Sequence, residues 1–170
     1  MKKYTIPFFL LGSLVMVYVM AKTGAPLKTS VSPLGILDLE FAYNAEKTAA
    51  VINAWIPLDN IAAAKLNTWL DFLFLFFYSF FLFFASKKIA RTFQGMIAKT
   101  GQLVAKGALA AGFLDILENI GMLIALNGHV SGGIAFCTTF FSIIKWGLAI
   151  IAVLYVLTGA IMLAYRVIKK

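Results

Sequence analysis

The chain has 170 residues, of which 62% are hydrophobic and only 13% are charged. Soluble globular domains average about 45–50% apolar residues, so this composition excludes a soluble or disordered protein and predicts an integral membrane protein. A net charge of +8 raises the question of a nucleic-acid partner, but the positions of the bases fit membrane topology anchors instead. With one cysteine, Cys137, and one histidine, His129, we expect no thiol-pair chemistry, no bis-histidine haem or other cofactor, and no metal site.

The first span is expected at residues 4–21, which carry no formal charge and follow two lysines. This pattern fits either a cleaved secretory signal or a first transmembrane helix. Because the apolar run is longer than a typical signal core, we expect an uncleaved helix. Pro7 suits the first turn of that helix, where its missing N–H has no partner to lose.

Residues 22–65 are expected to form a long loop outside the membrane. Glycine, proline and serine punctuate its first half, whereas Asn44 to Ile56 offers an asparagine cap and an early acid before Pro57. A short helix is therefore predicted there. It would either lie along the membrane surface with Trp55 at headgroup level, or pack on the ends of the bundle.

Three further spans are expected at about 66–86, 107–126 and 134–165, separated by a basic loop at 87–106 and a short turn at 127–133. The last contains 32 residues, or ~48 Å of helix against a ~30 Å hydrocarbon core. It must therefore tilt or project beyond the outer face, where the first loop could pack on it. The predicted fold is all-α, a four-helix transmembrane bundle in a single domain, 1–170.

The distribution of charge predicts the orientation of the bundle. Bases without any neighbouring acid occur before the first span, between the second and third, and after the fourth, whereas the 22–65 segment is balanced and the 127–133 turn carries no formal charge. The positive-inside rule then places the N-terminus, the 87–106 loop and the C-terminus in the cytoplasm of a cell with an inner membrane. These ten bases are Lys2, Lys3, Lys87, Lys88, Arg91, Lys99, Lys106, Arg166, Lys169 and Lys170.

Ionisable residues inside the spans are the candidate site, because each is costly in a membrane unless it is paired or hydrated. Asp115, Glu118 and Asn119 share one face of the third helix, and Asp71 and Tyr78 share one face of the second. Together with Lys145 on the fourth helix, the three acids leave a formal charge of −2. Water, a bound cation or protons must neutralise it, unless the cluster is only a structural polar network between helices.

Lys145 is expected to pair with a carboxylate from another helix. Counting ~1.5 Å per residue from the nearest basic anchor puts Lys145 close to the depth of Asp71, with Glu118 deeper but within reach of the lysine stem. The predicted order of partners is therefore Asp71 first and Glu118 second.

Three stretches, at 37–42, 69–78 and 111–119, resemble features of uncharacterised bacterial four-span integral membrane proteins. The resemblance covers about the middle half of the chain. It implies a four-span membrane fold and no particular activity.

Our leading hypothesis is an inner-membrane protein whose polar pocket, in the outer half of the bundle, binds or moves a small amphiphile, lipid or cation. The 22–58 segment would cover this pocket. A second hypothesis is a non-catalytic accessory subunit or assembly factor, with the aromatic face of the second helix docked on other membrane subunits. An acid/base enzyme ranks third, since no nucleophile or phosphate-binding motif accompanies the acids, and catalytic residues stay unassigned. Expected partners are membrane lipids. The candidate ligand-binding residues are Asp71, Tyr78, Asp115, Glu118, Asn119 and Lys145.

Overall fold

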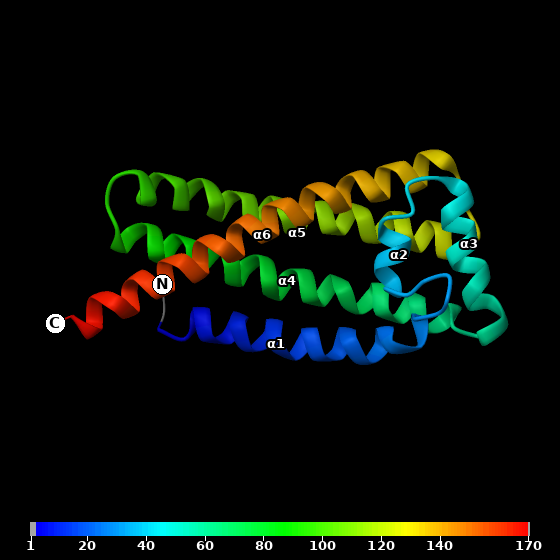
Figure 1. Ribbon diagram of the computed structural model, residues 1–170, viewed down its shortest axis with the longest axis horizontal. Coiled ribbons are helices and arrows are strands. Elements are labelled where there is room, and N and C mark those ends of the chain that lie inside the picture. The colour runs from blue at the N-terminus through cyan, green and yellow to red at the C-terminus, as the bar shows by residue number, and fades with distance from the viewer. Residues whose placement is uncertain (1–2, 170) are drawn as a thin grey trace.

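The computed structural model describes residues 3–169 and is helical, with no strand in that range. Four helices dominate: α1 (Thr5–Gly24), α4 (Ile61–Thr92), α5 (Met96–Leu126) and α6 (Gly132–Ile168). They run alternately in opposite directions along the long axis of the molecule (Figure 1). Each is long and apolar enough to cross a membrane, which confirms the prediction of four apolar helices of spanning length.

The helices are longer than the predicted spans. α4 and α5 continue through most of the segment expected as the 87–106 loop and leave only residues 93–95 as a connection. Gly95, at φ +69°, makes the sharp reversal there, in a conformation that residues with a side chain rarely adopt. Alanine, lysine and arginine on both sides favour helix, so hydrophobicity ends before the helices do.

The α4 helix is the centre of the bundle, and α1, α5 and α6 all pack against it. α1 packs mainly on α4, through the ring of Phe9, which lies 5.5–5.6 Å from the rings of Phe76, Phe80 and Phe84. α5 lies beside both α4 and α6. The aromatic face of α4 is therefore partly covered by the first helix of the same chain.

Between α1 and α4 the chain forms a small cap of two short helices, α2 (Ile36–Glu40) and α3 (Ala45–Trp55), with 3-10 turns η1 (Ala25–Leu27) and η2 (Ile56–Leu58). α3 occupies the segment where a short helix was predicted. Asn44 caps it by accepting a hydrogen bond from the backbone N–H of Lys47 at 2.8 Å. Both α2 and α3 contact α6, so the N-terminal part of this long helix supports the cap.

Trp55 decides between the two positions left open for α3. Its side chain is fully buried, and its indole N–H donates to the carbonyl of Leu27 at 2.8 Å and to Oγ of Ser32 at 3.0 Å. Leu39, Val51 and Met122 are in the same hydrophobic cluster, which joins the cap to the bundle. α3 is thus packed on the ends of the helices, and Trp55 is no headgroup anchor.

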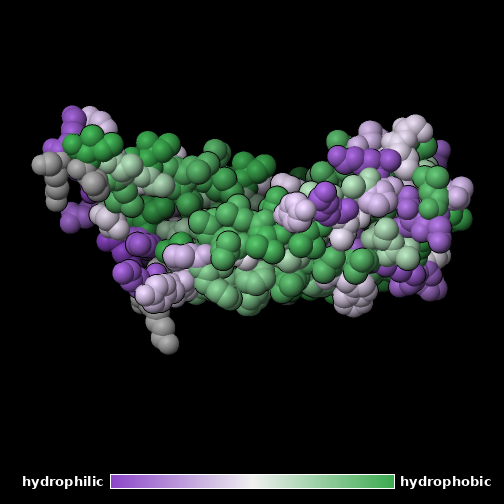
Figure 2. Space-filling view, turned by 90° about the horizontal axis from the view of Figure 1, so that it is seen from below, coloured by the Kyte–Doolittle hydropathy of each residue, from purple (hydrophilic) through white to green (hydrophobic). Residues whose placement is uncertain are grey.

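The surface divides into an apolar middle and two polar ends (Figure 2). We call the end that holds Lys3, the 93–95 turn and Lys169 the basic end, and the opposite end, with residues 25–60 and 127–131, the capped end (Figure 1). The apolar middle includes exposed large side chains of α1 and α6, such as Leu14, Tyr18, Ile150 and Leu154. Such a band is what a bilayer core requires.

Candidate functional site

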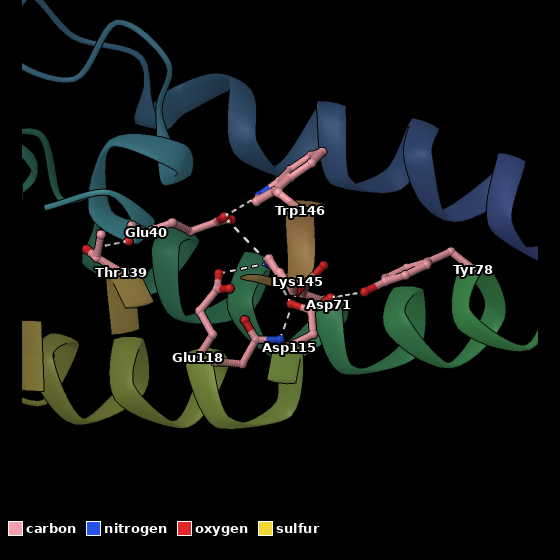
Figure 3. A network of polar contacts seen from close by, with 9 residues as sticks. Glu40, Asp71, Tyr78, Asp115, Glu118, Thr139, Lys145 and Trp146 are labelled. Carbon is pink, nitrogen blue, oxygen red and sulfur yellow. Dashed lines mark hydrogen bonds and ion pairs between the residues drawn. The ribbon is translucent and has the colours of Figure 1, made fainter. Parts of the chain in front are cut away.

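Lys145 is the centre of a buried cluster of charged side chains where α2, α4, α5 and α6 meet (Figure 3). This lysine is only 6% exposed. Its Nζ lies 2.6 Å from Oδ1 of Asp115, 2.8 Å from Oε1 of Glu118 and 3.5 Å from Oε2 of Glu40. One ammonium therefore serves three carboxylates, each from a position far away in the sequence.

The predicted order of partners for Lys145 is wrong in its first member. Asp71 forms no ion pair with Lys145 within the chain described, whereas Glu118, predicted second, does, and Asp115 is closer still. The depth count assumed that the basic anchors of α5 and α6 lie at one level. α6 runs on past the other helices at the basic end, so counting from Arg166 misplaced Lys145 relative to α4 and α5 (Figure 1).

Asp71 and Tyr78 join α4 to the cluster through hydrogen bonds to α5. Asn119 donates from Nδ2 to Oδ2 of Asp71 at 2.8 Å, and the hydroxyl of Tyr78 donates to Oδ2 of Asp115 at 2.7 Å. Asp115 is thus held from both sides, by Tyr78 on one oxygen and by Lys145 on the other. The structure brings together all six residues that the sequence singled out.

Glu40 is a member of the cluster that sequence reasoning missed. It ends α2 in the cap, yet the residue is only 6% exposed and its side chain points into the bundle toward Lys145 (Figure 3). Trp146 donates from Nε1 to Oε2 of Glu40 at 3.2 Å, and Thr139 donates from Oγ1 to the main-chain carbonyl of Glu40 at 2.9 Å. The signal in the sequence is an acid flanked by two large apolar residues, Leu39 and Phe41.

The cluster contains more acid than base. Four carboxyl groups, from Glu40, Asp71, Asp115 and Glu118, accompany the single ammonium of Lys145, which leaves a formal charge of −3 if all are ionised. Each of the five side chains is less than a tenth exposed. Such an excess of charge is expensive away from water, so something must balance it.

Three buried polar atoms in this region have no hydrogen-bond partner: Oε2 of Glu118, Oδ1 of Asn119 and Oγ of Ser142. Glu118, Asn119 and Ser142 are all fully buried. Ser142 precedes Lys145 by three residues on α6 and so lies on the same face of the helix. Because buried polar groups nearly always have partners, these atoms mark capacity for an additional hydrogen-bonding or charged group.

A small cavity lies near the cluster. One turn further toward the cap, Leu39, Gly121, Met122 and Thr138 are among the residues around a cavity of about 10 Å³. That is close to the minimum that one water molecule needs. Across residues 3–169, no group of three or more His, Cys, Asp or Glu side chains is arranged to hold a metal ion.

Comparison with protein-family models, with curated proteins and with solved structures finds no match for this chain. No activity can therefore be transferred from a relative. The function has to be argued from the charge cluster, its burial and the helices that carry it.

Proposed function

We propose that this chain is a multi-pass protein of the inner membrane whose buried charge cluster takes up and releases a small cation, with a proton as the first candidate. The observation that carries the proposal is the ratio of four carboxyl groups to one ammonium in a site almost closed to solvent. The unpartnered, fully buried Oε2 of Glu118 supports it, because it is an acceptor left open within the same site.

The burial of the site favours a proton or small ion over a lipid or other amphiphile, since each of its charged residues is less than a tenth exposed. The neighbouring cavity of about 10 Å³ is close to the minimum that one water needs. An amphiphile could enter only if α2, which carries Glu40 into the cluster, moved away. α2 is a helix of only five residues, and its movement is the route by which ions or water reach the site from the capped end.

The proposed orientation rests on the bases. Those within residues 3–169 that lack an acidic neighbour belong to the two ends of the chain and to the region around the 93–95 turn, at the basic end. By the positive-inside rule this end faces the cytoplasm, and the capped end with α2 and α3 faces outward. The charge cluster then opens toward the outer side of the membrane.

The accessory-subunit hypothesis rests on the aromatic face of α4, which α1 covers in part. The aromatic face of α4 was to dock on other membrane subunits, but Phe76, Phe80 and Phe84 pack on Phe9 of α1. Part of this face is therefore covered by the chain itself, whereas Trp69, Leu73 and Phe76 stay exposed, so the accessory-subunit function stays a prediction.

Infrared difference spectroscopy of the purified protein in lipid vesicles tests the proposal. The wild type should show the C=O stretching band of protonated carboxyl groups, with an intensity that changes with pH or with added sodium or potassium. Asp115→Asn and Glu118→Gln should each reduce this change. Asp59→Asn and Glu46→Gln are matched controls, since both acids are exposed, and Asn tolerates the left-handed backbone of position 59.

A band that responds to neither pH nor cations, and is the same in all four variants, would show that the cluster only holds the helices together. A response to sodium or potassium at constant pH identifies the metal ion as the bound cation, and a response to pH alone identifies the proton.

A further inference from the structure

We propose a second site, at the basic end and independent of the charge cluster. Lys87, Lys88 and Arg91 of α4, together with Phe84, bind the phosphate-bearing headgroup of an acidic phospholipid. These four residues line a cavity of about 170 Å³.

The four residues form one stripe along α4. They occupy positions i, i+3, i+4 and i+7, which share a face of an α-helix. The cavity is more than ten times the ~10–15 Å³ that a single water needs, so a phosphate group fits. One helix thus supplies three cationic groups around a space of suitable size.

No acid balances these three bases. The sequence has no Asp or Glu in 72–114 or 119–170, and every ion pair found between residues 3 and 169 involves Lys145. Lys87 places its ammonium over the ring of Phe83, 4.9 Å from the ring centre. Lys88 and Arg91 are exposed. An anion is therefore the group that would relieve the repulsion between them.

The position along α4 favours a lipid over a free anion. Phe84 closes the apolar part of the helix, and its ring packs 5.5 Å from Phe9 of α1, in the apolar middle. The bases begin three residues later, where the helix leaves that middle. An acidic phospholipid has the same sequence of parts, with acyl chains next to a phosphate. An arginine fork binds two phosphate oxygens, and lysines add charge.

Native mass spectrometry of the full chain, released from nanodiscs of mixed phosphatidylglycerol and phosphatidylcholine, tests this site. The wild type should retain phosphatidylglycerol several-fold more than phosphatidylcholine. The double variant Lys88→Gln, Arg91→Gln should lose most of this preference. The charge-matched control, Lys99→Gln with Lys106→Gln, should keep it, since both lysines are exposed bases of α5 outside the cavity.

Equal losses in the two double variants would overturn the proposal, because they would show only a diffuse attraction to a basic surface. Displacement of the lipid by inorganic phosphate, but not by chloride at the same ionic strength, would assign the cavity to free phosphate and overturn the lipid. A photoactivatable phosphatidylglycerol added to the wild type gives a measurement without substitutions. Cross-links should fall within 84–91, and cross-links confined to 96–106 would contradict the site.

Discussion

Trp146 and Glu40, which stand 106 positions apart, are joined by a hydrogen bond of 3.2 Å from the indole Nε1 to Oε2 of the carboxylate. The same Oε2 lies 3.5 Å from the ammonium of Lys145. Two consecutive residues of α6 thus hold one side chain of α2, and Thr139 binds the main chain of the same residue. This arrangement couples the cap to the charge cluster, so that a change in one is expected to alter the other.

Glu40→Gln should therefore loosen the cap. Glutamine keeps an acceptor for Trp146 but loses the ion pair with Lys145, while Glu40→Ala loses both. We expect faster amide hydrogen exchange over 36–42 in both variants, more so for alanine, with losses of about 1–3 kcal/mol in the free energy of local opening. Glu46→Gln, at an exposed position of α3, should leave exchange over 36–42 unchanged. Equal exchange in all variants would show that Glu40 does not hold α2.

Lys145 and Asp115 should behave as a coupled pair. Lys145→Met strands carboxylates in a buried site, and Asp115→Asn removes the closest partner of the ammonium, so each single change should cost about 3–5 kcal/mol of stability. The double variant should recover part of the combined loss. Thermal unfolding in detergent measures the cycle, and simple addition of the two losses would contradict the pair.

Asp71→Asn provides the comparison for that cycle. Asp71 accepts a hydrogen bond from Asn119 and forms no ion pair with Lys145 within residues 3–169, so its coupling to Lys145→Met should be smaller than that of Asp115→Asn. The sequence alone predicted the opposite order. A larger coupling for Asp71 than for Asp115 would show that Asp71 is the main partner of Lys145, contrary to the structure.

Trp55→Phe should destabilise the cap by about 1–3 kcal/mol, because phenylalanine fills the apolar site but leaves the carbonyl of Leu27 with one donor fewer. Ser32 still donates to that carbonyl at 2.8 Å, which limits the loss. Trp69→Phe is the control, since this tryptophan is 62% exposed. If both substitutions lower the unfolding temperature equally, the two indole hydrogen bonds of Trp55 contribute nothing to stability.

The four helical spans were predictable because the bilayer imposes a length and a polarity that are visible in the composition of each segment. The members of the site on α4, α5 and α6 were predictable for the same reason, since Asp71, Asp115, Glu118 and Lys145 are conspicuous in apolar surroundings. Their pairing was not, because it depends on how far each helix slides and tilts relative to its neighbours. An error of one helical turn in the relative height of two helices is enough to exchange Asp71 for Asp115 as the predicted partner of Lys145.

Glu40 shows a second limit. An acid in a segment that is expected to be hydrated costs little free energy, so Glu40 does not stand out in the sequence as Asp115 does within an apolar span. Only the folding of α2 onto α6, through Thr139 and Trp146, places it inside. Long-range packing of a short helix depends on contacts that no local sequence pattern encodes. Only the structure therefore shows that the cap contributes Glu40 to the site.

Orientation is the remaining prediction, and accessible cysteines test it. Cys137 is exposed and is first replaced by serine, after which Ser30→Cys and Gln94→Cys are introduced separately at exposed positions of the capped and basic ends. A membrane-impermeant maleimide added to intact cells should label the cysteine at 30. The cysteine at 94 should react only after the membrane is opened, because the bases around it hold that end in the cytoplasm. Labelling of position 94 in intact cells would show that the bundle has the opposite orientation, with the charge cluster facing the cytoplasmic side.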